Sequence, residues 1–184
     1  MVNFQGVWVN FIYNPADVLL RVMEGDRMNV REMVRAWLED EGMFKNEVDD
    51  ANADFHFIIE VPPGSNQIID IIAPRDRSLL LVASGIRLSE EHYSAVMNMD
   101  EKERERFMWE IRFSLIFLST EFQIIPDATS PQLFQFTRKL YQEDLTRQLL
   151  MDAIGEVHKC KLFIIWKMRE RFDRMDKDKG MMYI

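Results

Sequence analysis

The spacing of hydrophobic residues changes along the chain after Met28, and each change marks an expected element. Apolar residues first recur at helical spacing and are followed by Gly42, where a C-terminal helix cap belongs. These residues are Val30, Met33, Val34, Trp37 and Leu38. From Phe55 to Val82 the spacing becomes two, interrupted by turn residues at 62–66 and 74–77. The pattern predicts a helix and then a three-stranded antiparallel meander, with Phe44 to Val48 as a candidate strand before it.

Helical spacing returns after the meander, on both sides of two further expected strands at 121–125 and 133–141. A short helix is expected at 89–97, and Asp100 with Glu103 forms a capping box for a longer one. Nine of the twelve residues from Phe107 to Leu118 are apolar, which is more than one buried stripe needs. Burial in the core and a subunit interface are the two explanations that this run leaves open.

The last helix is expected to begin after Asp144 or Thr146 and to carry one apolar stripe, with Asp152, Glu156 and Lys159 opposite. The stripe consists of Leu150, Ile154, Val157, Cys160, Ile164 and Met168. Helices before, between and after groups of strands predict an α+β fold. We expect an antiparallel sheet, made of the three-stranded meander plus two later strands, packed with three main helices.

The expected domain organisation is simple: a single α+β domain at 29–172, an N-terminal appendage at 1–28 and a charged tail at 173–184. The appendage holds a strongly apolar stretch from Val7 to Tyr13, and Asn14-Pro15 predicts a short helix through Met23. An alternative is that translation begins at Met28, because codons for residues 24–26 can spell a ribosome-binding sequence. A membrane-surface role for Val7 to Met23 is a further, weaker hypothesis, since only Arg21 and Arg27 supply positive charge there.

Charge and cysteine content exclude several classes of function. The net charge of −8 argues against a general nucleic-acid binder, which needs a basic face. Between Arg31 and Glu60 nine acidic residues face three basic ones, which indicates either a solvated surface or a patch for a basic partner. Cys160 is the only cysteine, so no intramolecular disulfide and no cysteine-based zinc site forms. The sequence shows no membrane-spanning stretch and no secretory leader, so we expect a cytoplasmic protein.

The residues that most often carry chemistry lack the required arrangement. Asp50 to Asp54 has the acid spacing that opens a calcium loop, but the later ligand positions do not fit, so a polar turn is expected. The three histidines are not spaced as a helical metal pair, and Cys160 lies on an apolar stripe as expected for a buried, inert thiol. No glycine-rich phosphate loop or nucleophile elbow is present. We therefore predict no catalytic residue, no bound metal and no cofactor.

The order helix, meander, helix, two strands, helix over about residues 29–172 resembles that of type III secretion chaperones. Three stretches, at 53–57, 112–115 and 164–167, also resemble an uncharacterised and mainly archaeal protein family. The archaeal family supplies no activity and no catalytic residue. The chaperone resemblance implies a small acidic homodimer whose apolar grooves hold an extended segment of a client protein.

Our first hypothesis is therefore a non-catalytic protein-interaction module, a dimeric chaperone-like adaptor. Large apolar residues on late strands and helices are the candidates for binding a partner. They are Trp109, Phe113, Phe134, Phe136, Phe163 and Trp166. The alternative is a small-molecule sensor or enzyme with a pocket between sheet and helices, for which a cavity lined by His56, Glu60 or Asp70 would be the sign.

Overall fold

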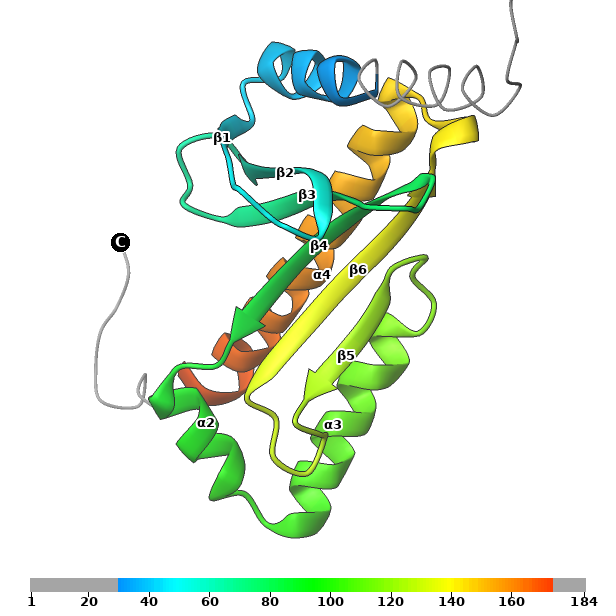
Figure 1. Ribbon diagram of the computed structural model, residues 1–184. Coiled ribbons are helices and arrows are strands. Elements are labelled where there is room, and N and C mark those ends of the chain that lie inside the picture. Colours follow the sequence, from blue (N-terminus) through cyan, green and yellow to red (C-terminus); the bar gives the residue numbers. More distant parts are fainter. Residues whose placement is uncertain (1–29, 174–184) are drawn as a thin grey trace, which may run out of the picture.

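Alternating apolar and polar residues build one six-stranded antiparallel sheet in the order β1-β2-β3-β4-β6-β5 (Figure 1). The computed structural model describes residues 30–173. The strands are β1 Phe44–Glu47, β2 Ala53–Glu60, β3 Ile68–Pro74, β4 Leu79–Arg87, β5 Glu121–Ile125 and β6 Leu133–Tyr141. The expected meander is therefore present as β2, β3 and β4, and the candidate strand before it is present as β1.

Three of the helices begin at a side chain that caps their first turn. Ser89 accepts a hydrogen bond from the His92 amide, Asp100 from the Lys102 amide and Thr146 from the Leu149 amide. The helices that follow are α2 Glu90–Met97, α3 Glu101–Leu115 and α4 Arg147–Phe172, with a short 3-10 turn, η1 Gln142–Asp144, before the last. Residues 30–40 are also helical, and Gly42 adopts a φ of 67° just beyond them. Thr146, of the two expected caps, thus begins α4, and glycine's freedom at positive φ permits the turn at Gly42.

The core lies between the sheet and α4, which runs behind the long strands β4 and β6 in Figure 1. All six residues of the expected α4 stripe are buried, which confirms that prediction. They meet alternate residues of the strands, including Phe57, Phe134 and Phe136, none of which is exposed. Val34 and Leu38 of the first helix also belong to this core. Burial of such side chains contributes about 1.5–3 kcal/mol each to the hydrophobic driving force.

One face of the sheet is covered more completely than the other. Along β2, Phe55, Phe57 and Ile59 are buried, whereas His56 and Ile58 between them are partly exposed. The strand's period of two places these sets on opposite faces. His56 therefore lies on the face away from the phenylalanines, as expected.

The sheet changes its pairing in the middle of β4. Residues Leu79 to Arg87 pair with β6 along their whole length, but only Leu81 to Ala83 pair with β3. Where β3 and β4 separate, the Ile68 carbonyl accepts hydrogen bonds from the Ser84 hydroxyl at 2.7 Å and the Lys161 ammonium at 3.0 Å. Burial lowers the pKa of Lys161, and nearby Asp70 acts in the opposite direction. These two side chains replace the strand partner that the carbonyl lacks.

The α+β class, the antiparallel sheet and the order of elements are confirmed. Two local expectations were wrong. The helix expected to continue to Leu118 ends at Leu115, and Glu156, expected on the polar side of α4, is half-buried against the sheet. The appendage at 1–28, with its apolar stretch, its short helix and the alternative start at Met28, lies outside the described residues, as does the tail beyond 173. Within the described residues, no helix is long and apolar enough to cross a membrane.

Candidate protein interaction surface

The apolar run that the sequence left unexplained is divided between the core and the outside. On α3, Phe107, Met108, Ile111 and Leu115 are buried. The remaining large apolar residues of the run are exposed. We call them the α3 surface: Trp109, Phe113, Ile116, Phe117 and Leu118. Because α3 contacts the core along one side only, its other side presents apolar residues to solvent.

The α3 surface is a stacked aromatic platform followed by a projecting turn. The rings of Trp109 and Phe113 stack with centroids 5.4 Å apart, and the Arg112 guanidinium lies 4.8 Å above the Trp109 ring. Trp109 is 45% exposed, Phe113 62% and Phe117 87%. A shallow hollow of about 470 Å³ is lined by these two aromatic residues of α3 and by three charged ones, Lys102, Glu105 and Arg106. Large rings with a cationic edge and a charged border are typical of protein-binding hot spots.

The segment that follows α3 is tied to the core. The Ser119 amide donates a hydrogen bond of 2.6 Å to Oε1 of Glu156 on α4. The other carboxylate oxygen of Glu156 forms an ion pair with Arg138 of β6. Both side chains of this pair are largely shielded from solvent. Phe117 and Leu118 are therefore held close to the core at their C-terminal side, which lowers the entropy cost of ordering them on binding.

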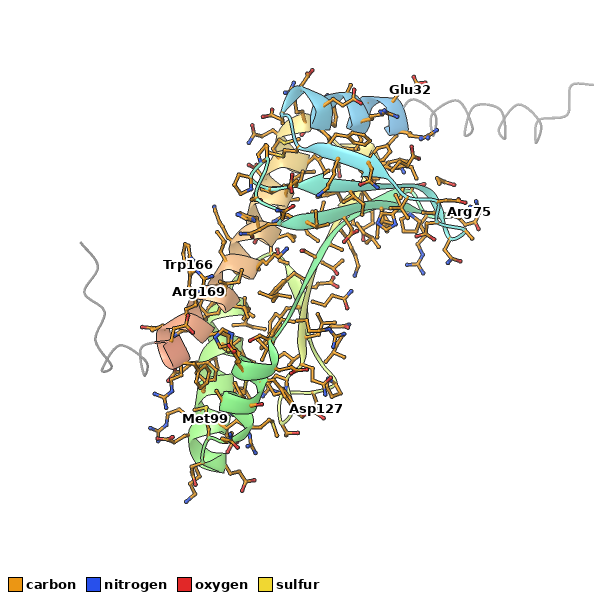
Figure 2. The ribbon with its side chains drawn as sticks, turned by 90° about the vertical axis from the view of Figure 1, so that its left-hand side faces the viewer. Glu32, Arg75, Met99, Asp127, Trp166 and Arg169 are labelled. Carbon is orange, nitrogen blue, oxygen red and sulfur yellow. The ribbon has the colours of Figure 1, made fainter. Side chains whose placement is uncertain are left out.

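The six residues proposed from the sequence occupy different environments. Trp109 and Phe113 belong to the α3 surface, and Phe163 is only partly exposed. Trp166 is 62% exposed, and Figure 2 shows it on the outer side of α4, away from the sheet. Phe134 and Phe136 have no exposed surface because their face of β6 is covered by α4. These two phenylalanines therefore cannot contact a partner in this fold, and their place as candidates is corrected.

Three residues of the α3 surface, Ile116, Phe117 and Leu118, were not among those six candidates. The apolar run from Phe107 to Leu118 was the signal that contained them. This run does not predict which of its residues face outward, because nearly every position in it is apolar. The end of the helix at Leu115 is what turns these three residues away from the core.

The polar residues considered for a small-molecule pocket stabilise the sheet and its turns. His56 Nε2 lies 2.9 Å from Asp70 Oδ1, and Asp50 Oδ2 lies 3.4 Å from His56 Nδ1 without hydrogen-bond geometry. Glu60 accepts hydrogen bonds from the amides of Gly64 and Asn66, and so fixes the turn after β2. All three candidates, His56, Glu60 and Asp70, alternate with buried residues and lie on the faces of their strands opposite those buried side chains. They therefore do not line a pocket between sheet and helices.

The remaining candidates for chemistry are also placed as structural groups. The Asp50 carboxylate accepts a hydrogen bond from the Asn52 amide at 2.9 Å, which confirms the polar turn expected in place of a calcium loop. Cys160 is buried, and this burial raises the pKa of its thiol, with a smaller opposite effect from the Thr120 hydroxyl. Among residues 30–173, no group of three or more histidine, cysteine or acidic side chains is arranged to hold a metal ion.

The architecture is shared with a solved archaeal structure. A crystal structure of an uncharacterized protein from Methanothermobacter thermautotrophicus is similar with a TM-score of 0.73 and 30% sequence identity, over 77% of this chain and 98% of that one. YbjN from E. coli gives a TM-score of 0.41 at 12% identity, over 70% of this chain and 86% of its own, which is too loose for residues to be compared. No curated protein matches the chain. Residues 30–168 match the model of a family described as "Uncharacterized conserved protein (DUF2299)". The archaeal relative and this match confirm the resemblance to an uncharacterised archaeal family, and the chain belongs to the DUF2299 family.

Proposed function

We propose that this protein is a non-catalytic protein-interaction module that binds its partner through the α3 surface. One observation carries the proposal: five large apolar side chains are exposed on the second half of α3 and in the turn that follows it, although other side chains of the same helix are buried in the core. Scattered exposed apolar residues are ordinary, but a contiguous group with a polar border is typical of an interaction site.

The chemistry of the surface favours a protein partner over a small molecule. Trp109 and Phe113 offer wide, rigid faces, and covering the exposed part of each ring adds to the hydrophobic driving force for binding. Their hollow is shallow and bordered by charges, whereas small-molecule sites are deep and mostly enclosed. An extended apolar segment of a client protein fits these features. In this proposal the protein acts as a chaperone-like adaptor in the cytoplasm.

The absence of catalysis in this proposal is supported by the contacts of the titratable groups. His56 is held by Asp70, and Glu60 by two backbone amides of its turn. The Cys160 thiol is buried, and its raised pKa disfavours the thiolate that acts as a nucleophile. Each group has a structural role that explains its position.

The test is purification of the tagged full chain from its native cell, with mass spectrometry of co-eluting proteins. The wild type is compared with the double variant Trp109→Ala/Phe113→Ala and with Trp166→Ala, which removes a similarly exposed tryptophan from another helix. We expect the wild type and Trp166→Ala each to co-elute with a client in an amount close to that of the tagged protein. The double variant should elute without this client.

Two results would contradict the proposal. A wild-type protein that elutes without a client would remove the adaptor role. Retention of the client by the double variant together with its loss in Trp166→Ala would move the binding site to the outer side of α4. Circular dichroism of each variant ensures that a lost client reflects the surface and not the fold.

A further inference from the structure

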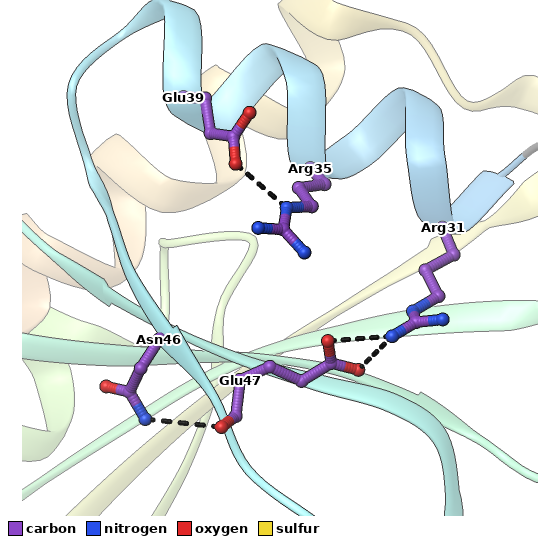
Figure 3. A network of polar contacts seen from close by, with 5 residues as sticks. All are labelled: Arg31, Arg35, Glu39, Asn46 and Glu47. Carbon is purple, nitrogen blue, oxygen red and sulfur yellow. Dashed lines mark hydrogen bonds and ion pairs between the residues drawn. The ribbon is translucent and has the colours of Figure 1, made fainter.

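The two edge strands of the sheet, β1 and β5, differ in how well they are protected from pairing with a further strand. β1 has only four residues, and its register with β2 shifts between Phe44 and Asn46. Arg31, from the helix at 30–40, donates to both carboxylate oxygens of Glu47 at 2.8 Å (Figure 3). Arg35 of the same helix lies 4.8 Å above the Phe44 ring. Short length, a register shift and charged groups are the means by which proteins prevent an edge strand from pairing further.

β5, at the opposite edge, lacks these protections. Its five residues pair with β6 in a regular register, and β5 has no other strand neighbour in the described sheet. The only charge on β5 is Glu121, which is bound to Lys139 of β6 at 2.7 Å. The next four residues, Phe122 to Ile125, are uncharged and mostly apolar. A regular edge strand whose single charge is already paired with the neighbouring strand is a template for a further strand.

The sequence of β5 is compatible with pairing to a second copy of itself. If two β5 strands run antiparallel about Gln123, this residue lies opposite the partner's Gln123. Phe122 then lies opposite the partner's Ile124, and Glu121 opposite the partner's Ile125. No two like charges meet, and the apolar residues pair on one face. Such a twofold arrangement extends the sheet across both molecules.

The α3 surface lies at the same end of the fold as this edge. Figure 1 shows α3 beside β5, and a hollow of about 330 Å³ is lined by Met108 and Trp109 of α3 together with Thr129 of the loop after β5. A copy that pairs through β5 therefore brings its own α3 towards this helix. The register described above, in which no like charges meet, favours a second copy as the partner of this edge.

We infer that a second copy of this chain pairs along the β5 edge, in an antiparallel β5–β5 homodimer centred on Gln123, which leaves the α3 surfaces of both copies for the client. The inference rests on the proposed function, because the dimer presents two copies of the surface that binds the client. The opposite edge at β1, which carries the protections described above, stays outside the interface.

The test uses charge at the centre of the pairing. Gln123 is exposed, so Gln123→Glu and Gln123→Lys leave the core intact, yet each places like charges opposite one another in the dimer. The matched control is Gln135→Glu on β6, an exposed glutamine that pairs with Gln123 within one molecule. Sedimentation equilibrium of the full chain measures the dimer dissociation constant for each protein and for an equimolar mixture of the two Gln123 variants.

We expect a wild-type dimer at micromolar concentration that Gln123→Glu and Gln123→Lys each weaken roughly fivefold, as for a cross-strand pair of like charges. The mixture should restore dimerisation, and salt should reduce the differences. Gln135→Glu should behave as wild type.

Five results would overturn the inference. A monomeric wild type would do so, while a client retained in the purification above would leave the proposed function standing. Equal weakening by Gln135→Glu, or a mixture that does not recover, would show that Gln123 does not face itself. A dimer that responds to Trp109→Ala/Phe113→Ala but not to charge at Gln123 would exclude the β5 pairing. Dimerisation that appears only after removal of residues 1–28 would assign this edge to the chain's own N-terminal segment.

Discussion

Arg138 of β6 forms an ion pair with Glu156 of α4 across the interface between the sheet and its central helix. Arg138 lies on the same face of the sheet as the buried Val82 of β4, its cross-strand neighbour. A charge placed there is costly unless it is paired. Glu156 meets this need and also accepts the Ser119 amide, so one carboxylate links the sheet, the central helix and the segment that carries the α3 surface.

Replacement of Glu156 should therefore destabilise the protein more than loss of an ordinary surface charge. Glu156→Gln leaves Arg138 shielded from water without a negative partner, and we expect a loss of about 1–3 kcal/mol in the free energy of unfolding. The control is Glu39→Gln, which breaks the exposed pair between Arg35 and Glu39 and should cost less than about 1 kcal/mol. Urea denaturation followed by circular dichroism measures both, and equal losses would show that the Arg138–Glu156 pair is not shielded.

Two phenylalanine variants distinguish core from surface in the aromatic residues that the sequence grouped together. Phe134→Ala removes a fully buried ring between sheet and α4 and should cost about 3–5 kcal/mol. Phe113→Ala removes a ring that is 62% exposed and should change stability by no more than about 0.5 kcal/mol in the monomer. The same denaturation experiment at low protein concentration compares them. Similar losses for the two variants would contradict the assignment of Phe113 to an exposed surface.

These two phenylalanines also show what the sequence can and cannot predict. Alternation along β6 correctly placed Phe134 and Phe136 on one face, because a strand's period is two. Which face α4 covers depends on packing between segments far apart in the chain, and no local pattern records it. Phe134 and Phe136 were expected to hold side chains of a client, but α4 of the same molecule packs on them instead.

The two long helices α3 and α4 differ in how well the sequence predicts their buried residues. On α4 the apolar stripe is narrow and predicts its buried residues correctly, from Leu150 to Met168. On α3 the run from Phe107 to Leu118 is apolar on nearly every side, so periodicity carries little information about its orientation. The capping residue Asp100 could be predicted because the cap is local, whereas the exposure of Trp109 and Phe113 follows only from where α3 lies beside the sheet.

The pH dependence of stability should contain a contribution from His158. Burial lowers the pKa of this imidazole, and the Lys161 ammonium adds to the effect. The unfolded chain, with a histidine pKa of about 6.5, then binds more protons than the folded one below that pH. Stability is therefore lost as the pH falls from about 6.5 through the lower pKa of the folded state.

His158→Gln should remove this part of the acid sensitivity. The expected result is a smaller loss of unfolding free energy between about pH 7 and about pH 5 than in the wild type. His92→Gln, which leaves His158 in place, should keep that loss. Proton NMR titration of the folded protein gives the pKa of His158 directly, and a value at or above that of a free histidine would contradict the prediction.

Reactivity of the single thiol reports on how often the core opens. Cys160 is only 1% exposed and its pKa is raised by burial, so its thiolate is both inaccessible and scarce in the folded protein. A thiol reagent such as dithionitrobenzoate should therefore react slowly with the native protein and quickly in denaturant. Because labelling then requires opening of the interface between α4 and the sheet, Phe134→Ala should accelerate it and Phe113→Ala should not. Rapid labelling of the native wild type would show that Cys160 is accessible, and equal rates in the two variants would show that its exposure does not depend on the core between α4 and β6.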